Sequence, residues 1–125
     1  MSLPEVEFQA HIASKTGKNV YMVRAPTNAE YPYLVQRVIT KNNHGYGVTQ
    51  MRIQLDIYAQ DPNGQGEAKT IAVDTHDAIH DAKDDIDAIS GSYRVSEMET
   101  FNSETKVFQI IMDAMLYYSE RAQFD

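Results

Sequence analysis

The chain has 125 residues, a length that fits one domain, and it contains no cysteine. Disulfides, thiolate metal sites and cysteine nucleophiles are therefore excluded. Acidic residues outnumber Lys and Arg 18 to 11, which gives a formal net charge of -7. Proteins that grip nucleic acid usually carry a basic patch, so no specific nucleic-acid binding is expected. No apolar run approaches the roughly 20 residues that span a bilayer, and no membrane association is expected.

The first segment is predicted to be a helix over residues 4–15. Pro4 suits the first helical position, Glu5 suits the positive end of the helix dipole, and Gly17 marks the stop. A short apolar strand is expected to follow at 20–23.

A β-hairpin is predicted next. Residues 33–40 are rich in β-branched and aromatic side chains, and the stretch 41–47 holds two asparagines and two glycines that favour a turn. In residues 49–60 apolar and polar side chains alternate, which predicts a strand with one buried face and one wet face. The apolar set is Met51, Ile53, Leu55, Ile57 and Ala59, and Tyr58 falls on the wet face.

The second half is predicted to contain one helix and two strands. The chain breaker at 61–66 precedes a helix over 67–83, a short strand lies near 93–98, and a turn at 101–105 leads into a long strand over 106–119.

The last strand is unusual because both of its faces are apolar. One face carries an unbroken apolar series from Phe108 to Tyr118, and the other carries Ile111, Met115 and Tyr117 among polar residues. A face this apolar is not suited to open water, so it predicts a partner surface.

The order of elements is one helix, three strands, one helix and two strands. Short connections between strands favour antiparallel pairing. The expected fold class is therefore α+β: a mostly antiparallel β-sheet, made of the hairpin and further strands, with two helices packed on one face. We expect one domain over 1–125, with a core at about 5–119 and a loose polar tail over 120–125.

Two histidines in the second helix invite a metal interpretation. The stretch HDAIHDAKDDID at 76–87 is similar to the zinc motif H-E-x-x-H with Asp in place of Glu. At about 100° per residue, His76 and His80 fall roughly 110° and 150° from the centre of the apolar stripe, toward solvent. A zinc site of this class needs both imidazoles in a cleft, a third ligand and a Glu base. His76 and His80 are therefore weak metal candidates beside the preferred interpretation, a solvated acidic face, and no cofactor is predicted.

No catalytic residue is predicted either. The sequence lacks a G-x-S-x-G element, a Walker loop and a dinucleotide-binding glycine pattern. The preferred interpretation of the eight tyrosines is that they form the rim of the core. The alternative is subunit contact, where large, stiff, amphipathic side chains are common. The candidate subunit or partner contact residues are Tyr46, Tyr58, Ile111, Met115 and Tyr117.

The chain as a whole resembles the tail-completion proteins of long-tailed bacteriophages and their prophage relatives. That group includes tail terminators and tail-to-head joining proteins. The resemblance covers roughly residues 5–119 and consists of patterns of fold, so it brings no catalytic residues with it. The segments that carry it are YPYLV at 31–35, RIQLDIYA at 52–59, AIHDA at 78–82 and KVFQIIMDAMLY at 106–117.

The resemblance implies a non-enzymatic virion assembly protein. Its expected form is a homo-oligomeric ring, typically a hexamer, that caps the tail tube, ends tube polymerisation and/or joins the tail to the head connector. The expected partners are the tail-tube protein and the head connector or completion protein. The expected locations are the host bacterial cytoplasm before assembly and the head-proximal end of the virion tail afterwards. DNA passes through such a ring without specific binding, and six copies at -7 would sum to about -42, which hinders sticking.

Two other functions stay open at the level of sequence. One is a cytosolic α+β binding module of unknown ligand that dimerises through a sheet edge. The other is a small metal-dependent hydrolase that uses His76 and His80. The three hypotheses predict different oligomers, metal contents and gene neighbours.

Overall fold

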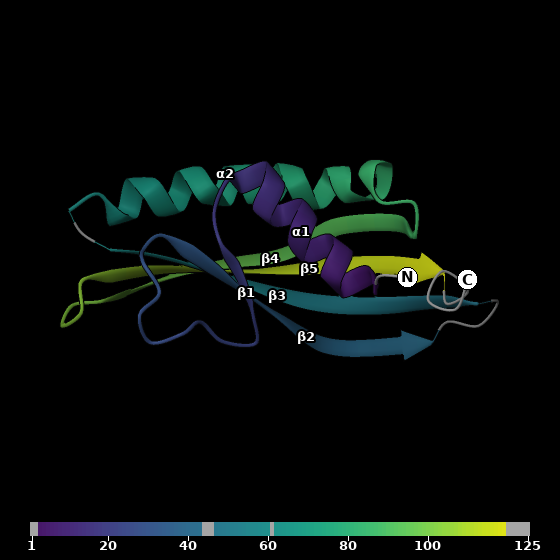
Figure 1. Cartoon of the computed structure of the whole chain (residues 1–125), viewed down its shortest axis with the longest axis horizontal. Helices are drawn as coiled ribbons and strands as arrows, with labels where there is room; N and C mark the ends of the chain where they lie inside the picture. Colours follow the sequence, from purple (N-terminus) through teal and green to yellow (C-terminus); the bar gives the residue numbers. More distant parts are fainter. Residues whose placement is uncertain (1–2, 44–46, 61, 120–125) are drawn as a thin grey trace.

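The computed structural model describes residues 3–43, 47–60 and 62–119. Two helices lie along one side of a single twisted sheet, and the opposite side of the sheet carries no described helix (Figure 1). The predicted α+β class is confirmed. The elements in chain order are α1 (Pro4–Thr16), β1 (Val20–Met22), β2 (Tyr33–Asn43), β3 (Val48–Gln60), α2 (Gly64–Asp85), β4 (Ile89–Asn102) and β5 (Val107–Ser119).

The five strands follow the spatial order β1-β2-β3-β5-β4. All neighbouring strands pair antiparallel except β1 and β2, which run parallel. The parallel pair is short, because β1 lies opposite only Leu34, Val35 and Gln36 of β2. The centre of the sheet is β3, which pairs along almost its whole length with β2 on one side and β5 on the other.

The core fills the space between the sheet and the helices. The five apolar residues predicted for the buried face of β3 are all completely buried, and so are Met112, Ala114 and Leu116 of β5. Phe8 and Ile12 of α1 are also completely buried and belong to the same core. The buried stripe of α2 is rich in alanine, and these small side chains let the helix axis lie close to the sheet. Its members are Gly64, Ala68, Ile71, Ala72, Thr75, Ala78, Ile79 and Ala82.

Polar contacts tie α1 to its neighbours. The Gln36 side-chain amide donates to the main-chain oxygen of Glu5 at 2.9 Å, and His11 Nε2 lies 2.7 Å from the main-chain oxygen of Ala78. The helix ends at Gly17, whose φ of 69° is the left-handed conformation that glycine adopts at little cost. No helix of the described chain combines the length and the apolar character needed to cross a membrane.

Several predicted boundaries are wrong in informative ways. The strand expected near 93–98 spans 14 residues, and its exposed half shows no alternation because water reaches both faces. Helix α2 begins at Gly64, inside the predicted breaker, where a Cβ would lie 2.8 Å from Phe108 Cδ2. Strand β1 ends at Met22 because Val23 turns the chain with a φ of 71°. The predicted tail at 120–125 lies outside the described residues.

Candidate interaction surface

The side of the sheet that the helices leave uncovered is here called the helix-free face. It consists of the side chains of β2, β3, β5 and β4 that point away from α1 and α2. Because neighbouring residues of a strand point to opposite faces, the polar half of β3 and the second apolar set of β5 both belong to it. The cross-strand partners at its centre are Gln50 and Tyr117, Arg52 and Met115, Gln54 and Asp113, Asp56 and Ile111, and Tyr58 and Gln109.

Four of the five predicted contact residues lie together on this face. Tyr58 projects from β3, and Ile111, Met115 and Tyr117 project from β5. All four are partly exposed, so a partner could reach them. Tyr46 lies outside the described residues. Contact of these residues with a subunit or a virion protein stays a prediction.

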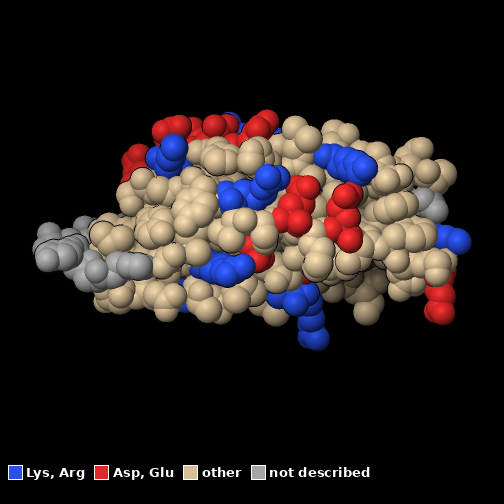
Figure 2. Space-filling view, turned by 180° about the vertical axis from the view of Figure 1, so that it is seen from behind, with Lys and Arg blue, Asp and Glu red and all other residues tan. Residues whose placement is uncertain are grey.

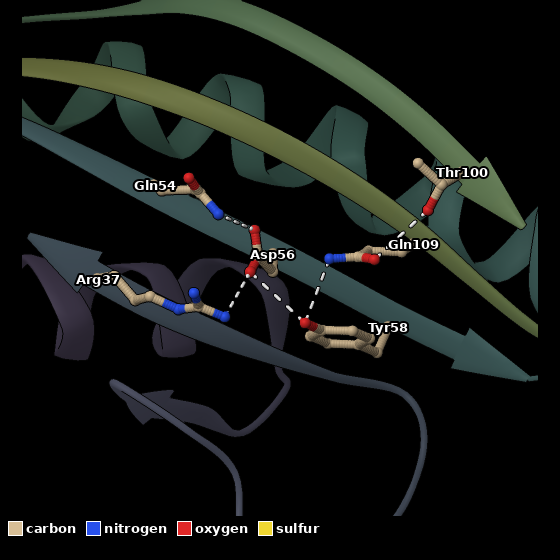
Figure 3. A network of polar contacts seen from close by, with 6 residues as sticks. All are labelled: Arg37, Gln54, Asp56, Tyr58, Thr100 and Gln109. Carbon is tan, nitrogen blue, oxygen red and sulfur yellow. Dashed lines mark hydrogen bonds and ion pairs between the residues drawn. The ribbon is translucent and has the colours of Figure 1, made fainter. Parts of the chain in front are cut away.

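An ion pair with a buried carboxylate lies in the middle of the helix-free face. The Asp56 side chain is only 1% exposed although neither described helix covers it. Its carboxylate accepts hydrogen bonds from Arg37 Nη2 at 3.2 Å, Gln54 Nε2 at 2.8 Å and Tyr58 Oη at 3.5 Å (Figure 3). A buried carboxylate is tolerated when a cation and further donors fill its acceptor positions, and this one meets that condition.

The same network continues across the sheet. Gln109 Nε2 of β5 donates to Tyr58 Oη at 3.2 Å, and Thr100 Oγ1 of β4 donates to Gln109 Oε1 at 3.4 Å (Figure 3). Hydrogen bonds therefore link side chains from four neighbouring strands. Burial raises the pKa of Tyr58, and the nearby Asp56 carboxylate raises it further, so the hydroxyl stays a donor at neutral pH.

A second ion pair balances the remaining charges of this face. Arg52 Nη2 lies 2.6 Å from Asp113 Oδ2, and Ser96 Oγ donates to the same oxygen at 3.3 Å. These four charged side chains thus form two ion pairs, Arg37 with Asp56 and Arg52 with Asp113. The negative charge of the protein gathers elsewhere, along the C-terminal half of α2 (Figure 2).

Tyrosine rings stack at two separate places on the helix-free face. Near the start of β2, the Tyr33 ring lies between those of Tyr58 and Tyr31, at centroid distances of 5.2 Å and 5.3 Å. Burial, followed by the neighbouring Tyr31 and Tyr58 hydroxyls, raises the pKa of Tyr33 to about 12. At the far end of the sheet, Tyr93 and Tyr117 stack at 6.4 Å.

The two tyrosine sites share one hydrogen-bond pattern. Gln50 Nε2 donates to Tyr117 Oη at 3.3 Å, which repeats the bond from Gln109 to Tyr58. The bond between Tyr93 and Tyr117, and then burial, raises the pKa of Tyr117. Both phenols are held in place before any partner arrives, which lowers the entropy that association must lose.

The two candidate histidines lie on the other side of the molecule. The His76 and His80 rings are 4.5 Å apart on α2. His80 is exposed, as predicted, but His76 is partly buried in a groove of about 320 Å³ between α2 and β4, so its predicted solvent position is only partly right. In the described ranges no three His, Asp or Glu side chains come together as a metal would require. A metal role for this pair remains untested.

Sequence reasoning missed the ion-pair network. Arg37, Asp56, Arg52 and Asp113 were visible only as polar positions of alternating strands. A pairing of opposite charges across strands depends on the register, and the register follows from tertiary packing.

The structure is an α+β fold whose sheet has one face that the described helices leave uncovered. The sequence profile of the tail completion protein gp17 family matches residues 6–119, so the chain belongs to that family. The resemblance inferred from sequence is confirmed.

One similar solved structure is a chain in the virion of a native gene transfer agent (GTA) particle. The TM-score is 0.64 at 17% identity, and the alignment covers 94% of this chain and 95% of that chain. At this identity the likeness establishes a shared fold. A comparison with curated protein sequences found no match.

Proposed function

We propose that the protein assembles into a homo-oligomeric ring, a hexamer, that caps the phage tail tube. The ring ends polymerisation of the tube and/or joins the tail to the head connector, and it sits at the head-proximal end of the virion tail. Membership of the tail completion protein gp17 family supports this role, and a phage-like particle contains a chain of the same fold. The role is non-enzymatic.

The observation that carries the proposal is the helix-free face. Its tyrosines and apolar side chains are the residue types that dominate protein interfaces, and its charges already have partners. Covering the Asp56 carboxylate would add little desolvation cost, because that carboxylate is already 1% exposed and paired with Arg37. A partner that presents an apolar surface could therefore pack on this face without leaving a buried charge unpaired.

The proposal is tested by the growth of tail tubes in vitro. Adding the protein to polymerising tail-tube protein should give short, capped tubes visible by electron microscopy. The variant Ile111→Lys should lose capping, because it places a charge at the centre of the helix-free face. Residue 111 is the cross-strand partner of Asp56. Val73→Lys is the matched control: it makes the same kind of change at a 61%-exposed position of α2 and should cap normally.

Two results would count against the role. Tube growth that is unaffected by the wild-type protein would overturn it. A strict dimer at every concentration and salt level, measured by size-exclusion chromatography with light scattering, would instead favour the dimeric binding module. The ring predicts a discrete species of about six times 14.2 kDa.

A further inference from the structure

Strand β4 forms a long edge of the sheet. It has 14 residues, well above the usual strand length of about 5–6, and among the described strands it pairs only with β5. Every residue from 93 to 102 is exposed. Four of the large hydrophobic side chains exposed in the described chain lie in this stretch: Tyr93, Val95, Met98 and Phe101. Proteins usually shorten or cover such an edge, since it invites pairing with another strand.

The opposite edge of the sheet is also open. Strand β1 pairs with Leu34 to Gln36 only, and beyond that point the Val23 amide donates to the Gln36 oxygen at 2.8 Å as the chain turns away. No described strand pairs with the outer side of residues 37–42 of β2. Ile39, at the irregular position of this strand, is 47% exposed.

The two open edges carry complementary charges. Residues 37–42 contain Arg37 and Lys41 and no acid, whereas β4 contains Glu97 and Glu99. Glu97 pairs with Arg94 at 3.4 Å, and Glu99 forms no ion pair with any residue in the described ranges. Lys41 already reaches Glu5, but an ammonium group has three donors and can serve a second carboxylate.

Three of these charges, Lys41, Glu97 and Glu99, point to the same side of the sheet. Lys41 lies opposite Met51, Glu97 opposite Met112 and Glu99 opposite Ile110, and all three partners face the helices. Residues directly opposite one another across an antiparallel pair share a face. A ladder between the two edges can therefore place Lys41 opposite Glu97 or opposite Glu99.

Strand direction allows such a ladder. Strand β3 is antiparallel to both β2 and β5, and β5 is antiparallel to β4, so β4 runs opposite to β2. A second copy in nearly the same orientation, placed beside β4, therefore offers its β2 antiparallel to that strand. The contact uses two different surfaces, so it repeats from copy to copy and closes into a ring when the rotation permits.

We infer that β4 of one copy pairs with residues 37–42 of β2 in the next copy, so that the sheet continues around the ring. The inference rests on the proposed ring and specifies its subunit contact. The occupant of each edge is a second copy of this chain. An antiparallel ladder between β4 and β4 of a partner, centred on Met98, is disfavoured because it would set Glu97 against Glu99 of the other copy.

Engineered cysteines test this contact, since the natural chain has none. Thr40 lies on the helix-free side of β2, and Met98 and Thr100 lie on the same side of β4. With Lys41 opposite Glu97, Thr40 falls opposite Met98; with Lys41 opposite Glu99, it falls opposite Thr100. The two double variants are Thr40→Cys with Met98→Cys, and Thr40→Cys with Thr100→Cys. Each is oxidised with and without the tail-tube protein and run on a non-reducing gel.

We expect one double variant to give a ladder of species above the dimer that a reductant removes. Each single variant should give no ladder, because a heterologous contact needs both cysteines. Thr40→Cys with Asp77→Cys is the matched control, with its second thiol on the exposed face of α2, and it should also give no ladder. Efficient dimer formation by Met98→Cys alone would indicate β4–β4 pairing and overturn the inference.

The failure of this inference is separable from failure of the ring. A ring mass measured by light scattering on the cysteine-free chain, together with no ladder from either double variant under both conditions, would reject the edge contact and leave the ring in place. The absence of both a ring mass and tube capping would reject the proposed function itself.

Discussion

The two faces of the sheet bury side chains in different ways, and adjacent residues of β3 show the contrast. Leu55 is completely buried, and its neighbour Asp56 is 1% exposed. Leu55 is buried under the helices, among apolar groups. Asp56 is buried by its own neighbours on the helix-free face, where Arg37, Gln54 and Tyr58 donate to its carboxylate.

The two faces therefore differ in what they contribute: one stabilises the fold, and the other stays accessible. The helix-covered face is sealed and contributes the apolar burial that folds the domain. On the helix-free face the polar side chains form hydrogen bonds with one another in the plane of the sheet. The surface of that face therefore remains accessible. Its central charges are paired, while Tyr58, Ile111 and Met115 remain partly exposed.

The largest loss of unfolding free energy is expected from a substitution in the core. Leu55→Ala should lower the free energy of unfolding by about 2–5 kcal/mol, because it removes buried methyl groups and leaves a cavity. Gln54→Ala, one residue away on the helix-free face, should cost less than about 1.5 kcal/mol. Urea denaturation of both variants compares the faces directly. Equal losses would mean that the helix-free face is part of the core.

The next largest effect is expected at the buried ion pair. Asp56→Ala should cost about 1–3 kcal/mol, since it leaves several donors without their acceptor. The loss should stay below that of a fully buried pair because Arg37 is 45% exposed and can be hydrated. Asp113→Ala should cost less, since the Asp113 side chain is 16% exposed. A larger loss at Asp113 would show that the two pairs have been ranked wrongly.

A pH effect of up to about 1 kcal/mol is expected from Tyr33. Its pKa is raised in the fold from the usual 10 to about 12, so the folded state holds the phenolic proton more tightly than the unfolded state does. Its contribution to stability is complete below pH 10 and is lost as the pH rises toward 12. Unfolding free energies of wild type and Tyr33→Phe at pH 9 and pH 11 measure this: the decline should be smaller in the variant. Identical declines in wild type and variant would show that Tyr33 does not cause the loss of stability at high pH.

Effects of similar size are expected from the paired phenols. Tyr58→Phe and Tyr117→Phe each lose a hydrogen bond from a glutamine, worth about 0.5–1.5 kcal/mol. Tyr58→Phe should be the more costly because its hydroxyl also donates to Asp56. Thermal unfolding gives the ranking, and the reverse order would mean that the bond to Asp56 is too weak to matter at its 3.5 Å length.

Much of the fold and part of the candidate surface could be predicted from sequence. The alternation in β3 and β5 placed Tyr58, Ile111, Met115 and Tyr117 away from the helices, as the structure shows. Strand β4 could not be delimited, because its exposed residues show neither a period of two nor a helical stripe. The half-buried position of His76 was also missed, since an angle on a helical wheel says nothing about the strand that lies beside the helix.

The sequence by itself determined the class of fold and which side chains share a face, because periodicity and chain breakers act locally. Only the tertiary structure decided what lies next to what. It joined Arg37 to Asp56 and Arg52 to Asp113, stacked tyrosines from separate strands, and left the edges of β2 and β4 open on opposite sides. These features depend on strand order and register, which come from packing the whole chain against its core and from no single segment of it.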